Sequence, residues 1–296
     1  MVDNRLIHLP YFLYLNTQLD ELSTYEKIKL IIKGKLISLI YSKFSDKNFC
    51  KMINTFFKFN NSLGFEKNLI VVNQDDVKYF FPNTFRALVY LHNFDDYHTS
   101  FLSSYCLDDI NFFDNDTIVD CGANIGELDL AIRSKNPHIN YIAFEPDPNA
   151  YKCLELNSFK NKRKLFNVAL SNKTGKENFY IDSIGANSSI EYFGEQNSIE
   201  VDCEKLDFYK LKNIKLLKMD AEGHEPEVLQ GSLKTLKNIQ YISIDFGNER
   251  GVNKDHTFIE VNNILIRNNF NLIKYSQTRM SGLYKNKNFN EWHKKT

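Results

Sequence analysis

The stretch TIVDCGANIGELDLAI, residues 117–132, decides the fold of this chain. Ile118 and Val119 form a short apolar run that ends in an acid, Asp120, and this pattern predicts a buried strand. Gly122 and Gly126 follow, and glycines let a backbone turn sharply and approach a ligand closely. A helix is expected next, and the free N–H groups at a helix start favour a carboxylate or phosphate. The stretch therefore predicts a ligand-binding loop, with a plain strand-to-helix turn as the alternative.

From residue 116 onward, predicted strands alternate with predicted helices. Apolar runs predict strands at Thr117–Cys121, Tyr141–Glu145, Leu165–Ala169, Lys215–Asp220 and Tyr241–Phe246. Helical patterns lie between them at Gly126–Ser134, Pro148–Asn157 and Glu225–Leu236, the last with an apolar stripe of Leu229, Leu233 and Leu236. The alternation predicts an α/β fold, a parallel sheet with helices on both faces.

Acids stand at or near the ends of four of these strands: Asp120, Glu145, Asp220 and Asp245. In open α/β sheets the ligand binds at the carboxyl ends of the strands, near the point where the strand order reverses. We therefore expect these four carboxylates to converge on one site.

The loop between the two glycines narrows the choice of ligand. It reads Gly122-Ala123-Asn124-Ile125-Gly126, which is neither the dinucleotide pattern GxGxxG nor a phosphate loop with Lys and Ser/Thr after its last glycine. Asp120 would repel a pyrophosphate but could pair with an ammonium group. Glu145 is expected to accept hydrogen bonds from ribose hydroxyls. S-adenosylmethionine has an amino-acid end and a nucleoside end, so it fits both acids.

The composition excludes several classes of protein. The chain has 296 residues with 37 basic and 37 acidic side chains, and a general nucleic-acid binder is usually basic. No basic segment followed by a long apolar one opens the chain, and no apolar stretch has the length of a membrane span. The cysteines are scattered without a CxxC pair, which favours a reducing compartment: Cys50, Cys106, Cys121, Cys153 and Cys203. We therefore expect a cytoplasmic protein.

Residues 1–95 carry no recognisable chemistry, and we expect a mainly helical extension there. Ser23 and Glu26 predict a capping box that opens a helix over residues 25–44. Its lysines do not share one face, so a packed amphipathic helix is favoured over one lying on a membrane: Lys27, Lys29, Lys33, Lys35 and Lys43. Two short strands are predicted around a turn at residues 74–76, followed by helices through residues 84–91 and 99–107.

Several segments follow one another in an order that resembles the FkbM-type methyltransferase family. They are VDCGANIGELDLAI, AFEPDPNAYKCLELN, NVALSNKTGKENFYI, LLKMDAEGHEPEVLQGS, YISIDFGNERG and HTFIEVNNILIRNNFNLI. The resemblance covers about residues 96 to 285. It implies a class I, Rossmann-like methyltransferase fold with a seven-stranded, mostly parallel sheet whose last strand is antiparallel. It also implies S-adenosylmethionine as methyl donor and a hydroxyl as acceptor, in a catalytic domain that we place at residues 96–296.

The resemblance also assigns residues to the cofactor. The loop around the methionine portion matches Asp120, Gly122, Asn124 and Gly126, the ribose-binding acid matches Glu145, and the segment beside the adenine matches Asn167 and Ala169. The signature DxEGxE matches Asp220, Glu222, Gly223 and Glu225. Many members have a Tyr-Glu pair before the first strand, whereas this chain has Tyr97-His98.

Three residues near the signature are candidates for catalysis. Asp220 is expected to position or deprotonate the acceptor hydroxyl, with a helix cap as the alternative. Glu222 is a second candidate for a catalytic role, and the alternative is that it only complements the helix dipole. His224 has a pKa suited to a base, but a solvated surface histidine is the plainer reading.

Three further residues are candidates for binding the acceptor: Asp245, Glu249 and Arg250. Arg250 would hold a phosphate or carboxylate of the acceptor, and a surface ion pair is its alternative. The carboxylates of Asp220, Glu222 and Asp245 also suit Mg²⁺, but no ligand-spacing motif demands a metal, so none is predicted.

The chain is thus expected to be an O-methyltransferase that acts on a free or nucleotide-linked sugar in surface polysaccharide biosynthesis. The alternatives are methyl transfer to a lipid or secondary metabolite, and a scaffold that binds S-adenosylmethionine without turnover. The expected partners are small molecules, with no nucleic acid and no membrane span, and association into homo-oligomers is left open. The first 95 residues are expected to cover the acceptor side of the site or to form a subunit contact.

Overall fold

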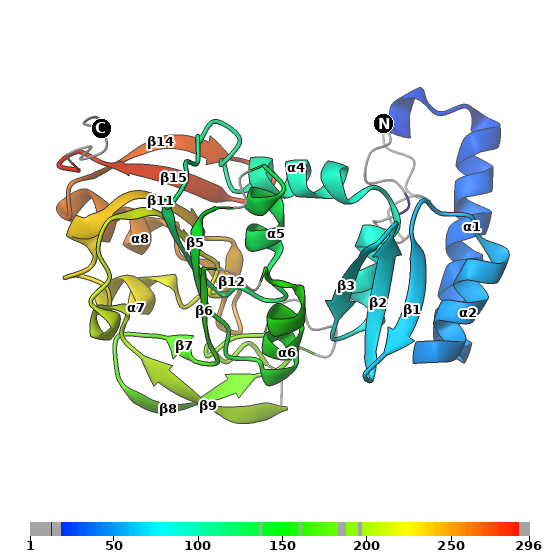
Figure 1. Ribbon diagram of the computed structural model, residues 1–296, viewed down its shortest axis with the longest axis horizontal. Coiled ribbons are helices and arrows are strands. Elements are labelled where there is room, and N and C mark those ends of the chain that lie inside the picture. Colours follow the sequence, from blue (N-terminus) through cyan, green and yellow to red (C-terminus); the bar gives the residue numbers. More distant parts are fainter. Residues whose placement is uncertain are drawn as a thin grey trace. The chain divides into compact units, whose positions relative to one another are not determined.

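The computed structural model describes residues 13, 19–135, 138–159, 162–182, 188–194 and 197–289 of the chain (Figure 1). The chain divides into two compact units, residues 1–97 and 98–296. The boundary falls within helix α4 (Phe94–Ser104). Among the described residues, no helix is long and apolar enough to cross a membrane.

The first unit contains an antiparallel sheet of three strands, in the order β1 (Ser62–Glu66), β2 (Leu69–Gln74) and β3 (Val77–Phe81). The two predicted strands and their turn are confirmed as β2 and β3, whereas β1 was not predicted. The helices of this unit are α1 (Thr24–Lys43), α2 (Asp46–Phe56) and α3 (Thr84–Leu88), with short 3-10 turns at Leu19–Glu21 and Val89–Leu91.

Helix α1 begins with the predicted capping box. The Ser23 hydroxyl accepts a hydrogen bond from the backbone of Glu26, and the Glu26 carboxylate accepts one in return from the backbone of Ser23 at 2.9 Å. Helix α2 packs on β1 and β2, and α1 packs on α2 (Figure 1). The residues that α1 buries are Gly34, Ile37 and Ile40.

The second unit is built on a seven-stranded sheet in the order β14-β15-β11-β10-β4-β5-β6. The strands from β11 to β6 are parallel to one another, and β15 runs antiparallel to both neighbours, which confirms the predicted class I methyltransferase fold. The strand bounds are β4 Thr117–Cys121, β5 Asn140–Phe144, β6 Arg163–Phe166, β10 Ile214–Met219, β11 Ile239–Asp245, β14 Phe270–Ser276 and β15 Ser281–Asn286. Val119, Leu217 and Ile242 pair across the middle strands and are fully buried, so the core lies at the centre of the sheet.

Helices cover both faces of this sheet, as predicted. Figure 1 shows α5 (Glu127–Arg133) and α6 (Pro148–Asn157) on one side, and α7 (Glu225–Gln230) and α8 (Phe258–Arg267) on the other. Helix α6 has the predicted bounds because Asp147 accepts a hydrogen bond from the backbone of Asn149 and proline stands at the first helical position.

Two predicted elements are shorter than expected. The predicted helix over residues 225–236 ends at Gln230, and its C-cap is Gly231, where a Cβ would lie 1.9 Å from the carbonyl oxygen of Ser171. Only a 3-10 turn, Leu236–Asn238, follows, and Leu233 of the predicted stripe is exposed. The predicted strand over residues 165–169 ends at Phe166.

Two small sheets complete the second unit. One has the order β7 (Ala169–Leu170), β9 (Ser198–Glu204) and β8 (Gly175–Tyr180), preceding a 3-10 turn at Leu206–Tyr209. The other pairs β12 (Asn248–Arg250) with β13 (Asp255–His256). Neither sheet was predicted, since the strands of both are largely polar.

Candidate active site

The glycine loop lies directly against the segment that follows β10. Gly122 has a φ of +69°, and a Cβ there would lie 1.9 Å from the carbonyl oxygen of Asp220. The backbone N–H of Asp220 donates to the carbonyl of Cys121 at 3.1 Å. Gly126 then forms the N-cap of α5. The predicted cofactor loop and the candidate catalytic acid are therefore in backbone contact.

Asp120 is buried and pairs with a lysine of the neighbouring strand. Lys218 stands beside Asp120 in the parallel register of β10 and β4, and its ammonium lies 3.2 Å from Asp120 Oδ1. The Tyr141 hydroxyl donates to Asp120 Oδ2 at 2.6 Å. Burial raises the pKa of Asp120, and Lys218 opposes that rise. Asp120 was predicted to pair with an ammonium group of a ligand. The ammonium that pairs with it here belongs to Lys218.

Lys218 is itself nearly inaccessible and connects several parts of the site. Its ammonium donates to the carbonyl of Gly122 at 2.8 Å and lies 3.9 Å from Asp220 Oδ2. Burial lowers the pKa of Lys218, but the negative charges of Asp120 and Asp220 together raise it above its usual range. Lys218 was not predicted as a site residue, although a charged side chain among the apolar residues of LLKM was a signal.

Glu145 holds the glycine loop and the loop after β5 together. Its carboxylate accepts hydrogen bonds from the backbone N–H groups of Asn124 at 2.7 Å and Asp147 at 2.9 Å. Burial raises the pKa of Glu145 to about 7. The Asn167 amide donates to the carbonyls of Glu145 and Pro146, at 2.8 and 3.0 Å. Asn124, Glu145 and Asn167 therefore form one cluster.

The cluster suits a cofactor that offers both amine and hydroxyl groups. Asn124 Oδ1 is buried and, among the residues that the structure describes, has no hydrogen-bond partner, so it can accept a bond from a ligand. Asn167 and Ala169 were both predicted to lie beside the adenine. The side chain of Asn167 is exposed, whereas Ala169 is buried in β7. The residues present fit S-adenosylmethionine.

Asp220 lies just beyond the end of β10 and is held by two side chains. The Tyr105 hydroxyl donates to Asp220 Oδ2 at 2.5 Å, and Arg279 Nη2 donates to the same oxygen at 2.8 Å. Helix α7 begins after His224, and no side chain caps it. The contacts of Asp220 thus do not include the helix cap that was its alternative role.

Arg279 joins Asp220 to Asp245. Its Nε lies 2.7 Å from Asp245 Oδ2, and its guanidinium lies 4.2 Å from the ring centre of Tyr105. Asp245 pairs with Ser281 in the antiparallel register of β11 and β15, so the turn before β15 brings Arg279 to the ends of the central strands. Neither Arg279 nor Tyr105 was predicted, because each is far from the signature along the chain.

Two glutamates lie close to the acids just described. Burial, together with the charges of Asp220 and Glu249, raises the pKa of Glu222 well above its usual range. Burial and the charges of Asp220 and Asp245 likewise raise the pKa of Glu249 to about 8. Glu222 has a left-handed backbone with a φ of 50°. Both carboxyls therefore hold their protons to higher pH than ordinary glutamates do.

Glu225, the last acid of the signature, supports the loop before α7. Its carboxylate accepts hydrogen bonds from the backbones of Ala221 at 2.9 Å and Gly223 at 3.1 Å, and from the hydroxyl of Thr257 at 3.0 Å. It is fully buried. These contacts fix the path of the segment that carries Asp220.

The two other predicted residues of this region are held by partners. His224 is buried, with Nδ1 2.8 Å from Glu191 and Nε2 3.0 Å from Ser171 Oγ. Arg250 makes two hydrogen bonds with the Glu227 carboxylate, at 2.7 and 2.9 Å. These contacts hold both side chains in place, and the roles of the two residues in binding and chemistry stay predictions.

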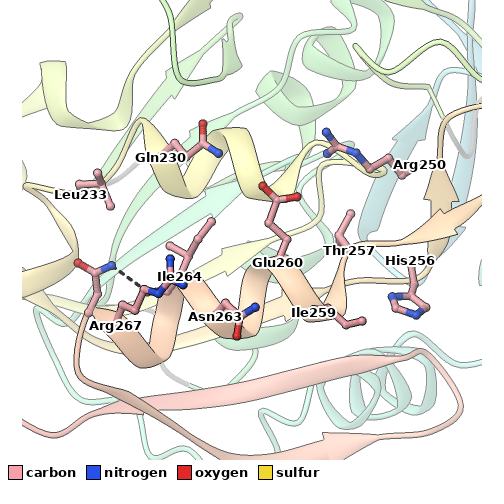
Figure 2. A pocket seen from close by; sticks show the side chains of 11 residues that line it. Gln230, Leu233, Arg250, His256, Thr257, Ile259, Glu260, Asn263, Ile264 and Arg267 are labelled. Carbon is pink, nitrogen blue, oxygen red and sulfur yellow. Dashed lines mark hydrogen bonds between the residues drawn. The ribbon is translucent and has the colours of Figure 1, made fainter.

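Arg250 also lines a pocket of about 660 Å³ between α7 and α8. Figure 2 shows Arg250 at one end of this pocket and Arg267 at the other, with Glu260 between them. Neither Asp220 nor Asp245 lines it. The pocket is therefore separate from the carboxylates at the strand ends.

Two groups of described side chains lie close enough together to hold a metal ion. They are Glu191, His224 and Glu227, and Asp220, Glu225 and Glu249. Most of the ligand atoms already have protein partners, as described above. The prediction that no metal takes part stays a prediction.

The strand order, the glycine loop and the acids at the strand ends define a class I, Rossmann-like methyltransferase. The model of the methyltransferase FkbM domain matches residues 120–272, more than half of the chain, so the chain belongs to this family. Its cofactor is S-adenosylmethionine.

Three curated relatives show the range of the family. Methyltransferase sdnD of Sordaria araneosa is 30% identical over 44% of this chain and 65% of its own length. The 2-O-methyltransferase NoeI of Sinorhizobium fredii is 25% identical over 45% of this chain and 63% of its own. The hexuronic acid methyltransferase AglP of Haloferax volcanii is 28% identical over 45% of this chain and 56% of its own. The chain thus matches less than two thirds of each relative.

Among solved structures, the chain is similar to a methyltransferase FkbM from Methylobacillus flagellatus. The sequence identity is 18% and the TM-score is 0.43, over 60% of this chain and 45% of that one.

Proposed function

We propose that the protein transfers a methyl group from S-adenosylmethionine to a hydroxyl of a sugar, in the synthesis of a surface polysaccharide. The observation that carries the proposal is the contact of the glycine loop with Asp220, because it joins a cofactor loop to an acid that can face an acceptor. The names of two relatives, a 2-O-methyltransferase and a hexuronic acid methyltransferase, support oxygen and a sugar as acceptor.

Asn124 and Glu145 would hold the cofactor, with the backbone of the glycine loop between them. When bound, S-adenosylmethionine supplies an electrophilic methyl group. The buried pair of Asp120 and Lys218 fixes the loop on which these contacts depend, since Lys218 also binds the carbonyl of Gly122. Such a preformed site lowers the entropy that must be lost when the cofactor is ordered.

Asp220 orients the acceptor hydroxyl and accepts its proton as the oxygen attacks. Tyr105 and Arg279 fix the carboxylate in one orientation, which favours alignment of the acceptor oxygen with the methyl carbon. Both donors also stabilise the negative charge of Asp220, which weakens it as a base. Positioning is therefore the larger part of its contribution. Glu222 and Glu249 lie close to it, and their raised pKa values limit the further negative charge beside Asp220.

Turnover on a panel of free and nucleotide-linked sugars tests this proposal. Mass spectrometry should detect a product heavier than its sugar by one methyl group. Asp220→Asn should lower that turnover by roughly 100-fold, whereas Asp108→Asn, which alters a surface carboxylate paired with Lys274, should not. Turnover on lipids or secondary metabolites alone would favour the first alternative, and cofactor binding without any turnover would favour a scaffold.

We also propose that residues 1–95 cover the acceptor side of the site or form a subunit contact. The residues assigned above to the cofactor and the acceptor all lie in the second unit, which supports an accessory role for the first. A chain that starts at residue 96, with its turnover and association state unchanged, would overturn both options.

A further inference from the structure

Helix α1 of the first unit has two apolar faces, and only one of them is buried. Gly34, Ile37 and Ile40 lie on the buried face, on the helix that packs on α2. The opposite face carries a row of apolar side chains, each between 47% and 74% exposed, here called the α1 stripe: Tyr25, Ile28, Ile32, Leu36 and Leu39. Their spacing of three or four residues places them along one side of the helix. The helix therefore presents a continuous apolar face to its surroundings.

The five lysines of the helix do not share one face, but three of them lie at or near this stripe. At about 100° of rotation per residue, Lys29 and Lys35 fall on opposite edges of the stripe, and Lys43 falls in line with it at the end of the helix. All three side chains are exposed. Lys33 lies farther round, with its ammonium 4.1 Å from the ring centre of Phe59. The lysines at the edges are thus turned toward the same side as the stripe.

The helix has almost no negative charge to balance these lysines. Its one acid, Glu26, lies in the first turn and is engaged by Ser23 in the capping box. Lysines at the borders of an exposed apolar face add electrostatic attraction to anionic lipid headgroups. The lysines reach lipid phosphates while the apolar side chains enter the boundary of the acyl region.

We propose that the α1 stripe binds the surface of an anionic lipid bilayer. A second copy of the chain is a poorer partner, because pairing two stripes would bring Lys29 and Lys35 against like charges, with no acid at the borders to pair with them. This binding is independent of the methyl transfer proposed above. It gives the protein a second property, localisation at a charged membrane surface.

Co-sedimentation of the full chain with lipid vesicles tests the proposal. The chain should bind vesicles containing phosphatidylglycerol and phosphatidylcholine at least about tenfold more strongly than vesicles of phosphatidylcholine alone, and binding should weaken as salt is raised. The double variant Ile32→Asp/Leu36→Asp should lose at least about tenfold in binding. Both positions are exposed, so circular dichroism should report an unchanged fold.

Charge variants separate this site from unspecific attraction. Lys29→Gln/Lys35→Gln should weaken binding to the anionic vesicles severalfold, whereas Lys210→Gln/Lys212→Gln, an equal loss of exposed charge in the second unit, should leave it unchanged. Equal loss in both pairs would overturn the proposal. So would a wild type that ignores vesicles, or one that forms dimers which Ile32→Asp/Leu36→Asp dissociates. Because the readout is vesicle binding, failure here leaves the proposed methyl transfer intact.

Discussion

Arg279 and Asp220 are 59 residues apart in the sequence, and their side chains meet at 2.8 Å, Nη2 to Oδ2. The same guanidinium reaches Asp245, so one arginine neutralises two acids that end adjacent strands. Charge repulsion between Asp220 and Asp245 is thereby reduced, and the orientation of Asp220 is fixed. A site that relies on a positioned carboxylate depends on such a partner.

Arg279→Gln should lower kcat by roughly tenfold or more, because Asp220 loses the contact that orients it. Steady-state kinetics with saturating cofactor would measure this change. Arg267→Gln, which alters an exposed arginine on α8, should leave kcat unchanged. If Arg279→Gln instead raises KM for the acceptor at constant kcat, Arg279 binds the acceptor and does not position Asp220.

Lys218→Met should lower the free energy of unfolding by about 3–5 kcal/mol, since it leaves Asp120 buried without its cation. Urea denaturation followed by circular dichroism would measure the loss. Lys215 lies on the same strand but is half-buried, so Lys215→Met is the matched control. It should lower the free energy of unfolding by less than about 1 kcal/mol. Equal effects of the two substitutions would show that the buried ion pair has no special role.

Glu145→Ala should weaken the binding of S-adenosylmethionine by about 1–3 kcal/mol, because the glycine loop loses the acceptor of the Asn124 N–H group and the cofactor loses a carboxylate. Isothermal titration calorimetry would measure the affinity. Glu155→Ala removes an exposed glutamate from α6 and should leave it unchanged. An affinity of wild-type strength in Glu145→Ala would remove Glu145 from the cofactor site.

Stability should fall as the pH rises, and Glu249 should contribute to the fall. The pKa of this carboxyl is about 8 in the folded chain against 4.5 as its ordinary value. The folded state therefore holds a proton that the unfolded state has lost, and the stability due to that proton disappears between these two values. Glu249→Gln keeps a neutral side chain throughout.

The free energy of unfolding of Glu249→Gln, relative to that of wild type, should rise by on the order of 1 kcal/mol or more between about pH 5 and pH 8.5. Urea denaturation at both pH values would measure the difference. Glu200→Gln, at a surface ion pair with Lys176, serves as the control and should show no such trend. A constant difference between Glu249→Gln and wild type would contradict the raised pKa.

Local patterns in the sequence predicted those elements whose causes are themselves local. The capping box of α1 and the first turn of α6 depend on neighbouring residues, and both were predicted. The end of α7 was not predicted, and the backbone that Gly231 meets there, at Ser171, is distant in the chain.

The candidate site divides in the same way. The acids at the strand ends were visible in the sequence, since each follows an apolar run. The partners of these acids, Tyr105, Lys218 and Arg279, were not predicted, because only the folded sheet brings them to the strand ends. Arg279 depends on the pairing of β15 with β11, and no pattern within the turn itself predicts that register.

Strand β15 is the last of the sheet along the chain, yet it lies between β11 and β14. A ribosome therefore releases the glycine loop, β10 and β11 before the residues that neutralise Asp220 and Asp245 have been made. Until β15 is made and pairs with β11, both acids lack Arg279. If methyl transfer depends on these acids, as proposed, a product cut short before residue 279 is expected to lack activity.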